Sequence, residues 1–354
     1  MLATMLSHHK AAIRAIVLSL FAFNSGAAYQ TFSTNDTRLA ATIDRAIEEE
    51  VRKGFSGAVL VARGKYRIVD RGYGSVRSSP VRSETRFWIA SAAKQFVSAS
   101  ILKLVERGLL DLRDPLAKFF RDAPADKRTI TVEQLLAHLS GLDNSYVSEG
   151  LADRDTAVKL MLAEPLAEKP GKKFRYSNSN YQLAVAVVEI VTGRSYKEFV
   201  VEELWRPAGL RNTGFSGGAG SRQVAPAVAD TPLRLTKSEW GGEGVYSTTG
   251  DLLKWYRALQ SGQLLFAESM KRLFTGVTPI GEGQSALGWF IGRTEKGATR
   301  IFTRGNEGFG ANALVYLYPE THTVIIVLSH AGQANPDTSW SRLVHNKIEK
   351  LLSL

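Results

Sequence analysis

The 354-residue chain contains no cysteine, which excludes disulfide bonds and thiolate metal sites. It also lacks a glycine-rich phosphate loop ending in Gly-Lys-Ser/Thr and a His-Glu-x-x-His helix, and its 6 histidines do not cluster. The sequence therefore gives no support for nucleotide or zinc chemistry. We expect the protein to work without a metal or a cofactor.

Long apolar runs and long basic runs are absent as well. Beyond the first thirty or so residues no apolar stretch is long enough to span a membrane, so we expect no membrane span in the mature chain. The net charge is +11, but Lys and Arg are spread along the chain without a recognisable nucleic-acid motif. An anionic envelope polymer or no specific partner suits this charge better than nucleic acid does.

The N-terminus has the pattern of a secretory signal peptide over residues 1–28. Lys10 and Arg14 precede an apolar stretch over 15–23, and small residues follow at 25–28. An N-terminal amphipathic helix is the alternative interpretation, but the apolar stretch is short and turn-like sequence follows it. We expect a secreted or periplasmic protein.

Strand patterns lie at both ends of the chain, around a helical middle. Runs 55–62 and 65–73, separated by Arg63-Gly64, predict a hairpin, and β character returns at 286–291, 299–303, 312–318 and 323–328. Helical spacing occurs at 38–51, 91–107, 131–138, 181–191, 251–259 and 339–352. This predicts an α+β fold, in which one sheet domain is closed by the strands of its two termini and carries an all-helical insertion. We expect a sheet domain over 29–110 and 240–354 and a large all-α insertion over 111–239.

Ser91-Ala92-Ala93-Lys94 is the first candidate for catalysis. Because residues i and i+3 share a helix face, the Lys94 amine can lie beside the Ser91 hydroxyl and act as its base. The free N–H groups of a helix N-terminus also favour a developing oxyanion. Ser-x-x-Lys alone also describes a surface lysine near a helix start. Here the apolar run 87–90 precedes Ser91 and an apolar-periodic helix follows, which predicts a buried turn.

Tyr176-Ser177-Asn178 is the second candidate. A tyrosine hydroxyl held near a lysine amine can relay a proton to a leaving group, and the Asn178 amide can orient that lysine and bind a substrate carbonyl. The same residues can also form a capping turn before the helix at Tyr181. Both interpretations can hold together.

These motifs, with Leu135-Leu136-Ala137-His138-Leu139-Ser140-Gly141-Leu142 and Gly244-Val245-Tyr246-Ser247-Thr248-Thr249-Gly250-Asp251-Leu252, resemble the beta-lactamase-related serine hydrolases. That family holds class C beta-lactamases, penicillin-binding DD-peptidases, D-amino-acid peptidases and esterases. The resemblance runs from about residue 55 to 329. It implies an antiparallel sheet flanked by helices, an all-α domain, and a site between them.

The third motif of the family, Lys or His followed by any residue and Gly on a sheet strand, is irregular here. Thr303-Arg304-Gly305 keeps the glycine but has threonine in place of the cation, whereas Arg304-Gly305-Asn306 keeps a cation and loses the glycine. Both registers remain open. If Arg304 points into the cleft, substrates with a terminal carboxylate are favoured, and this is our expectation. If it points away, an uncharged ester or amide is favoured.

The resemblance also implies an oxyanion hole made by the main-chain N–H of Ser91 and of Asn306 or Glu307. His138 ends a capped helix, so we expect a structural role for it. Gly214-Phe215-Ser216-Gly217-Gly218 matches Gly-x-Ser-x-Gly, but it lacks the strand before and the helix after that a nucleophile elbow requires.

The sequence as a whole predicts an exported serine hydrolase. Ser91 forms the acyl-enzyme, Lys94 and Tyr176 share its proton, and Asn178, Arg304, Gly305 and Asn306 bind a small ester, amide or D-amino-acid peptide, with cell-wall-derived substrates included. A true class C-like beta-lactamase is one alternative. A catalytically inactive, penicillin-binding-like envelope protein is another, because of the irregular third motif.

Overall fold

The structure is a computed structural model and describes residues 34–148, 150–218, 220, 223–225, 244–306, 310–331 and 339–354. The expected signal peptide, residues 1–28, lies outside these residues. None of the helices in the described ranges combines the length and the apolar character needed to cross a bilayer.

An antiparallel sheet of eight strands forms the centre of the molecule, in the order β2-β1-β13-β12-β11-β10-β9-β8. The expected hairpin at Arg63-Gly64 joins β1 to β2. Gly57 of β1 lies opposite Ser329 of β13, so the sheet brings the N- and C-terminal strands together as predicted. The strands are β1 (Gly57–Arg63), β2 (Tyr66–Tyr73), β8 (Thr278–Ile280), β9 (Gly283–Ser285), β10 (Phe290–Arg293), β11 (Thr299–Asn306), β12 (Asn312–Tyr318) and β13 (Thr323–Ser329).

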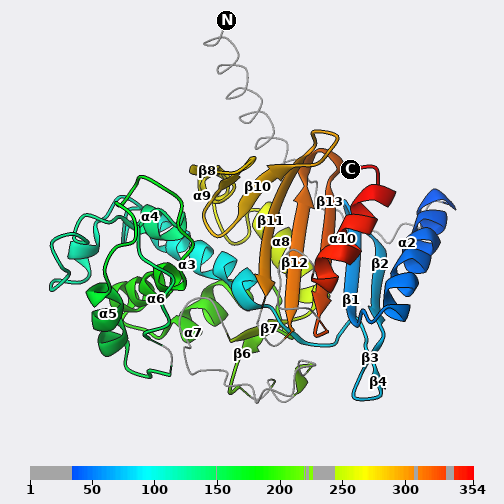
Figure 1. Ribbon diagram of the computed structural model, residues 1–354, viewed down its shortest axis with the longest axis horizontal. Coiled ribbons are helices and arrows are strands. Elements are labelled where there is room, and N and C mark those ends of the chain that lie inside the picture. Colours follow the sequence, from blue (N-terminus) through cyan, green and yellow to red (C-terminus); the bar gives the residue numbers. More distant parts are fainter. Residues whose placement is uncertain are drawn as a thin grey trace, which may run out of the picture.

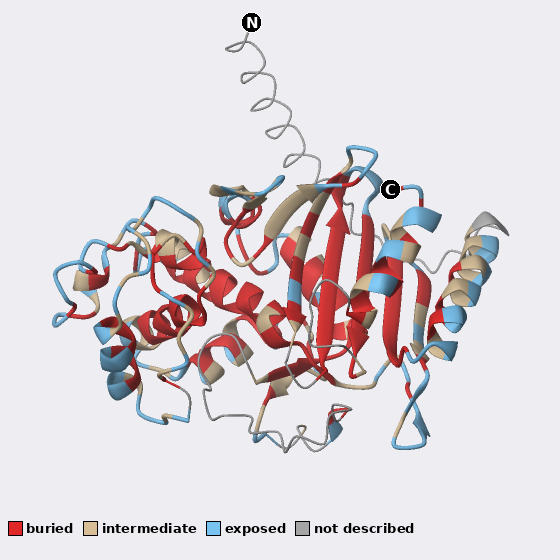
Figure 2. Ribbon diagram, in the orientation of Figure 1, coloured by how far each residue is buried: buried red, intermediate tan, exposed pale blue. Residues whose placement is uncertain are grey.

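Helices cover both faces of this sheet (Figure 1). On one face lie α2 (Thr34–Arg52) and α10 (Trp340–Leu351), and α8 (Thr249–Gln260) packs on the other. Strand alternation supplies both cores, because Val59 and Val61 join the cluster under α2 and α10 while Ala58 and Leu60 join the larger cluster on the opposite face. The central strands β1, β13 and β12 are therefore buried almost throughout, whereas β2 and β10 are partly exposed (Figure 2).

The middle of the chain is helical, in a group beside the sheet (Figure 1). Its helices are α3 (Lys94–Glu106), α4 (Val132–Leu136), α5 (Arg154–Ala163), α6 (Asn178–Thr192) and α7 (Tyr196–Val200). The Thr-x-x-Gln pattern forms a capping box, in which Thr131 accepts from the Gln134 N–H and the Gln134 side chain accepts from the Thr131 N–H. Gly193 closes α6 with a φ of 66°. The α+β architecture is confirmed, whereas the division at residues 111 and 239 stays a prediction.

The expected strand over 286–291 is wrong over residues 286–289. A hairpin of β8 and β9 ends at Ser285, and β10 begins only at Phe290. Between them Gly288 has a φ of 75°, and a Cβ there would lie 2.7 Å from Ser98 Oγ and 3.1 Å from the Lys94 carbonyl oxygen. The chain turns at Gly288 because it packs directly on α3, a contact between distant segments that strand propensity does not encode.

A small three-stranded sheet lies next to the segment that leads into Ser91. Its order is β5 (Phe87–Trp88), β7 (Val245–Ser247) and β6 (Gly214–Phe215). The Ile89 N–H continues this pairing with a 3.0 Å hydrogen bond to the Val245 carbonyl. The segment that leads into Ser91 is therefore fixed to the Val245-Tyr246-Ser247 motif.

Candidate active site

Ser91 lies in a buried turn at the start of α3. The 3-10 helix η1 (Ala90–Ala93) runs directly into α3, and this turn places the Lys94 Nζ 3.0 Å from the Ser91 Oγ. Ala90 has a φ of 48°, a conformation that costs a residue with a side chain about 1–2 kcal/mol. The surrounding contacts therefore hold the residue before Ser91 in a strained backbone conformation.

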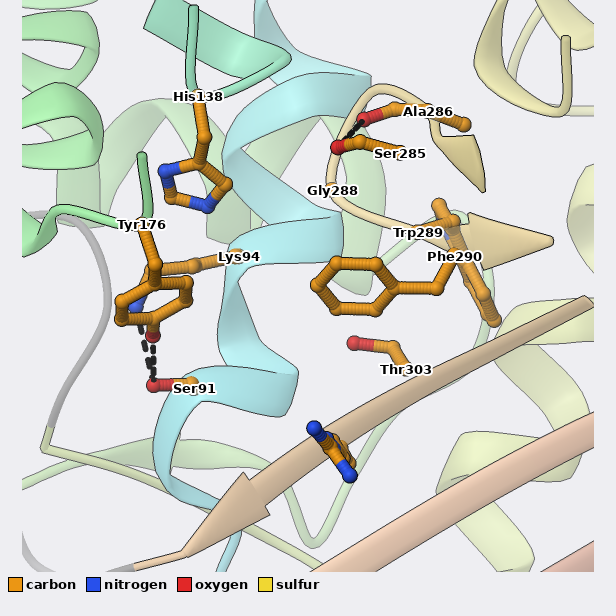
Figure 3. Close-up of a pocket in the computed structure, with 11 residues that line it drawn as sticks. Ser91, Lys94, His138, Tyr176, Ser285, Ala286, Gly288, Trp289, Phe290 and Thr303 are labelled. Atoms are coloured by element: carbon orange, nitrogen blue, oxygen red, sulfur yellow. Dashed lines mark hydrogen bonds between the residues drawn. The ribbon is translucent and has the colours of Figure 1, made fainter. Parts of the chain in front are cut away.

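Tyr176 and Asn178, at the start of α6, complete a four-residue network with Ser91 and Lys94. The Ser91 Oγ lies 2.7 Å from the Tyr176 hydroxyl, and Lys94 Nζ donates to Asn178 Oδ1 at 2.9 Å. The Tyr176 hydroxyl also donates to Asn178 Oδ1, at 3.3 Å. Figure 3 shows Ser91, Lys94 and Tyr176 converging at one end of the pocket.

The network has one consistent direction of donation. Asn178 Oδ1 can only accept, so Lys94 and Tyr176 both donate to it. Because the Tyr176 proton is used in that bond and Lys94 donates to Ser91 Oγ, the Ser91 proton is directed at the Tyr176 oxygen. The hydroxyl of Ser91 is thus positioned to lose its proton toward Tyr176.

Lys94 is only 3% exposed. Its amine lies 5.1 Å from the centre of the Tyr176 ring and 5.5 Å from that of the Tyr181 ring. Within the described part of the chain no carboxylate forms an ion pair with it. Its partners are neutral oxygens and aromatic faces.

Three hydrogen bonds hold the Tyr176-Ser177-Asn178 turn against the segment after α4. The Ser177 N–H donates to His138 Nδ1 at 3.2 Å, and the Ser177 hydroxyl donates to the Asp143 carbonyl at 2.7 Å. The Asn178 N–H donates to Asn144 Oδ1 at 2.9 Å. Asn144 was not among the residues expected from the sequence, although it follows the motif at 135–142 by two positions.

His138 is buried beside the network as a neutral imidazole. Burial, reinforced by the charge of Lys94, holds the pKa of His138 well below its ordinary value. Its Nδ1 accepts from the Ser177 N–H, so Nε2 carries the proton. The ring also packs against Tyr176 and lines the pocket. The structure agrees with a structural role for His138 and adds a direct contact with Tyr176, which local sequence did not indicate.

The third motif takes the Thr303-Arg304-Gly305 register when judged by its contacts. A Cβ on Gly305 would lie 2.0 Å from the Ile89 carbonyl oxygen and 2.9 Å from the Ala92 nitrogen, so only glycine allows β11 to lie against the turn of Ser91. Thr303, two residues earlier, shares the face of Gly305 and lines the pocket. Asn306 follows at the end of β11, and Glu307 lies outside the described residues.

The expectation that Arg304 points into the cleft does not agree with the strand geometry. Arg304 borders the pocket, but it pairs with Leu314, which belongs to the core under α2 and α10. Thr303 pairs with Val315, which belongs to the core on the opposite face. Since directly paired residues point to the same side of a sheet, the Arg304 side chain is on the face away from Ser91.

The pocket has an empty volume of about 270 Å³, counting space open to solvent. Its far wall is the segment that was expected to be a strand, and this wall was not predicted as part of the site. The aromatic pair Trp289-Phe290 is the sequence feature that could have indicated it. The lining residues are Ser91, Lys94, His138, Tyr176, Ser285, Ala286, Gly288, Trp289, Phe290, Thr303 and Arg304 (Figure 3).

The Gly-x-Ser-x-Gly segment is not a nucleophile elbow. Gly214 and Phe215 form the two-residue strand β6, a turn follows them, and Ser216 does not line the pocket. This agrees with the sequence analysis.

Comparison with known proteins gives the same picture. The family described as Beta-lactamase matches residues 43–346. The chain is 25% identical over 319 residues to the putative penicillin-binding protein PbpX of Bacillus subtilis, covering 85% of this chain and 76% of that protein. It is 27% identical over 329 residues to Protein flp of Staphylococcus aureus strain N315, covering 84% of this chain. That match includes 64% of Protein flp, so the chain spans just under two thirds of the length of this relative.

Solved structures share the fold. A penicillin-binding protein from Bacillus halodurans superposes with a TM-score of 0.72 at 24% identity, covering 88% of this chain and 99% of that one. The D-amino acid amidase from Ochrobactrum anthropi SV3, complexed with L-phenylalanine amide, superposes with a TM-score of 0.74 at 18% identity, covering 89% and 98%. With a family match over most of its length and this shared fold, the chain belongs to the Beta-lactamase family of serine hydrolases.

Proposed function

We propose that the protein is an exported hydrolase that forms an acyl-enzyme through Ser91 on a small ester, amide or D-amino-acid peptide. The observation that carries the proposal is the network of Ser91, Lys94, Tyr176 and Asn178, with all donor–acceptor distances between 2.7 and 3.3 Å. A serine hydroxyl needs such a base within hydrogen-bond reach to become a nucleophile. The basic, apolar and small-residue pattern over 1–28 supports export.

The chemistry follows from the direction of the network. In the reactive state the Lys94–Tyr176 pair has released one proton to solvent. It takes the proton of Ser91 as the Oγ bonds to the substrate carbonyl carbon. The pair then gives that proton to the leaving nitrogen or oxygen, whose bond to the carbonyl carbon breaks. Water attacks the acyl-enzyme in the same way, giving a proton to the pair and returning Ser91 to its hydroxyl form.

The same arrangement supplies places for the substrate. Gly305 lies against the turn of Ser91, so the end of β11 runs beside the nucleophile, and the main-chain N–H groups of Ser91 and Asn306 are the proposed oxyanion hole. Asn178 is the proposed partner of a substrate amide. Lys94 forms no ion pair with a carboxylate of the described residues. Proton transfer between Lys94 and Tyr176 therefore breaks no ion pair.

Intact-mass measurement with a fluorophosphonate tests this proposal. We expect one adduct on the wild-type protein and none on Ser91→Ala, while Ser216→Ala, at the Gly-x-Ser-x-Gly segment outside the pocket, keeps the adduct. An unlabelled wild-type protein, or an adduct that survives Ser91→Ala, would show an inactive envelope protein or a different nucleophile. Turnover of a chromogenic cephalosporin faster than that of short esters would favour the class C-like beta-lactamase instead.

A further inference from the structure

The hydroxyl of Thr303 faces the pocket and has no hydrogen-bond partner among the described residues. Thr303 is 2% exposed, and no hydrogen bond joins its hydroxyl to any residue in the described ranges. In Figure 3 its oxygen points into the space between Phe290 and Ser91. The oxygen borders the open space of the pocket, so a ligand that enters and displaces water there has to supply the partner of this hydroxyl.

The strand around Thr303 is accessible to such a ligand from one side. The pairing of β10 with β11 ends at Phe290 opposite Phe302, so the β10 ladder does not extend to Thr303, and Thr303 lines the pocket instead. Gly305 keeps the strand close to Ser91. A substrate whose carbonyl reaches Ser91 therefore passes alongside Thr303.

The cations near the pocket are not placed to bind a carboxylate beside Thr303. Lys94 and Arg304 are the cations among the lining residues. The Lys94 amine already donates to Ser91 and Asn178. The Arg304 side chain belongs to the opposite face of β11, with Leu314, and its charge acts on Tyr316 of that face.

We propose that Thr303 selects substrates whose leaving group carries an uncharged polar group, a carboxamide or an ester, in place of a carboxylate. The inference rests on the proposed function, because it describes what Ser91 attacks. A threonine hydroxyl can donate to a neutral carbonyl or accept from an amide N–H. It offers a carboxylate only one neutral donor, which does not offset the loss of hydration when a charge enters a mostly apolar pocket.

The test uses two esters that differ only at the proposed contact. Both carry the N-acetyl-D-alanyl acyl group, and the leaving alcohol is D-lactamide in one and D-lactate in the other. For the wild-type protein we expect kcat/KM to be at least about tenfold higher for the lactamide ester, because an unpaired charge is excluded. Esters are chosen because they are more easily cleaved than amides, so a measurable rate is expected for the preferred member.

Three variants locate the effect. Thr303→Val keeps the shape and removes the hydroxyl, so we expect kcat/KM for the lactamide ester to fall about tenfold and the preference to shrink. Thr303→Lys supplies a cation and should reverse the preference toward the lactate ester. Thr299→Val is the matched control, because Thr299 lies on the same face of the same strand, is buried, and does not line the pocket. We expect it to leave the ratio of the two rates unchanged.

The outcomes separate the inference from the proposed function. A wild-type preference for the lactate ester, equal rates for both esters, or no turnover of either ester while fluorophosphonate still labels Ser91 would overturn the inference alone. Selective loss of lactate turnover in Arg304→Ala would also overturn it, because the guanidinium would then be the carboxylate partner. Absence of labelling at Ser91 would overturn the proposed function itself.

Discussion

The imidazole of His138 packs against the phenol ring of Tyr176, with ring centroids 4.6 Å apart. Through its Nδ1 the same imidazole accepts the N–H of Ser177, the next residue along the chain. One neutral histidine therefore positions both the ring and the backbone of the proposed proton relay. It acts through Tyr176, which makes it a positioning residue.

Substitution of His138 should separate a positioning role from a role as a base. In His138→Asn the Oδ1 can replace Nδ1 as acceptor, and asparagine tolerates the φ of 57°. We expect this variant to retain most of the stability and activity. In His138→Ala the Ser177 N–H loses its partner, which should cost about 1–3 kcal/mol of unfolding free energy and lower kcat. Urea denaturation and the pH profile of kcat measure both effects. If kcat falls equally in the two variants and no longer rises with pH as it does in wild type, His138 acts as a base instead.

Tyr176→Phe tests the relay itself. The ring that packs on His138 stays, but the hydroxyl bonds to Ser91 and Asn178 are lost. We expect kcat to fall by about 10²–10⁴-fold with little change in unfolding free energy, because general acid–base catalysis contributes an effect of this order. Tyr196→Phe is the control, since Tyr196 is a buried tyrosine outside the pocket. A kcat within a fewfold of wild type for Tyr176→Phe would remove Tyr176 from the mechanism.

Gly305→Ala should displace β11 from the turn of Ser91. Its Cβ would meet backbone atoms of Ile89 and Ala92 at 2.0 and 2.9 Å, so the strand or the turn has to move. We expect a loss of about 1–3 kcal/mol in unfolding free energy and much slower fluorophosphonate labelling. The matched control is Gly292→Ala in β10, whose Cβ would first meet the Arg300 side chain, at 3.3 Å. If both variants label at the wild-type rate, the close approach at Gly305 has no role in catalysis.

Buried histidines should make the fold sensitive to acid at mild pH. Burial lowers the pKa of His345 to about 3, against an ordinary value of 6.5. The unfolded chain then binds more protons than the folded one below pH 6.5, so stability falls as the pH falls from 6.5 toward 3. The slope for one such histidine is at most about 1.4 kcal/mol per pH unit. Between pH 7 and pH 5 we expect wild type to lose about 2 kcal/mol more than His345→Gln.

Urea denaturation at the two pH values measures this difference. His322→Asn is the control, because His322 is exposed, and we expect its loss to match that of wild type. The window above pH 5 is chosen because most carboxylates titrate below it. Identical losses in wild type and His345→Gln would contradict the assignment.

The parts of the fold that sequence predicted are those encoded by neighbouring residues. The capping box at Thr131 and Gln134, the left-handed stop at Gly193 and the hairpin at Arg63-Gly64 each depend on residues within one turn of each other. The spacing of Ser91 and Lys94 also belongs to this class, because one helical turn brings the two side chains together.

The parts that sequence did not predict depend on contacts between distant segments. The register of Thr303, Arg304 and Gly305 is set by pairing with β12 and by the approach to Ile89, neither of which leaves a pattern in the local sequence. The turn at Gly288 is fixed by Ser98 and Lys94 of α3, which overrides the strand propensity of the segment. His138 and Asn144 become neighbours of the site only when α4 and α6 meet.

The pairing of β1 with β13 has a consequence for the time at which the protein becomes active. During synthesis Ser91 and Lys94 emerge early, but the strand that lies against their turn, β11, and the strand that ties the sheet to its N-terminal edge, β13, come near the end. Closing the sheet requires a long loop and is a slow, non-local step. A nascent chain therefore carries Ser91 and Lys94 before β11 can lie against their turn, and under the proposed function we expect hydrolysis only after the last strands are in place.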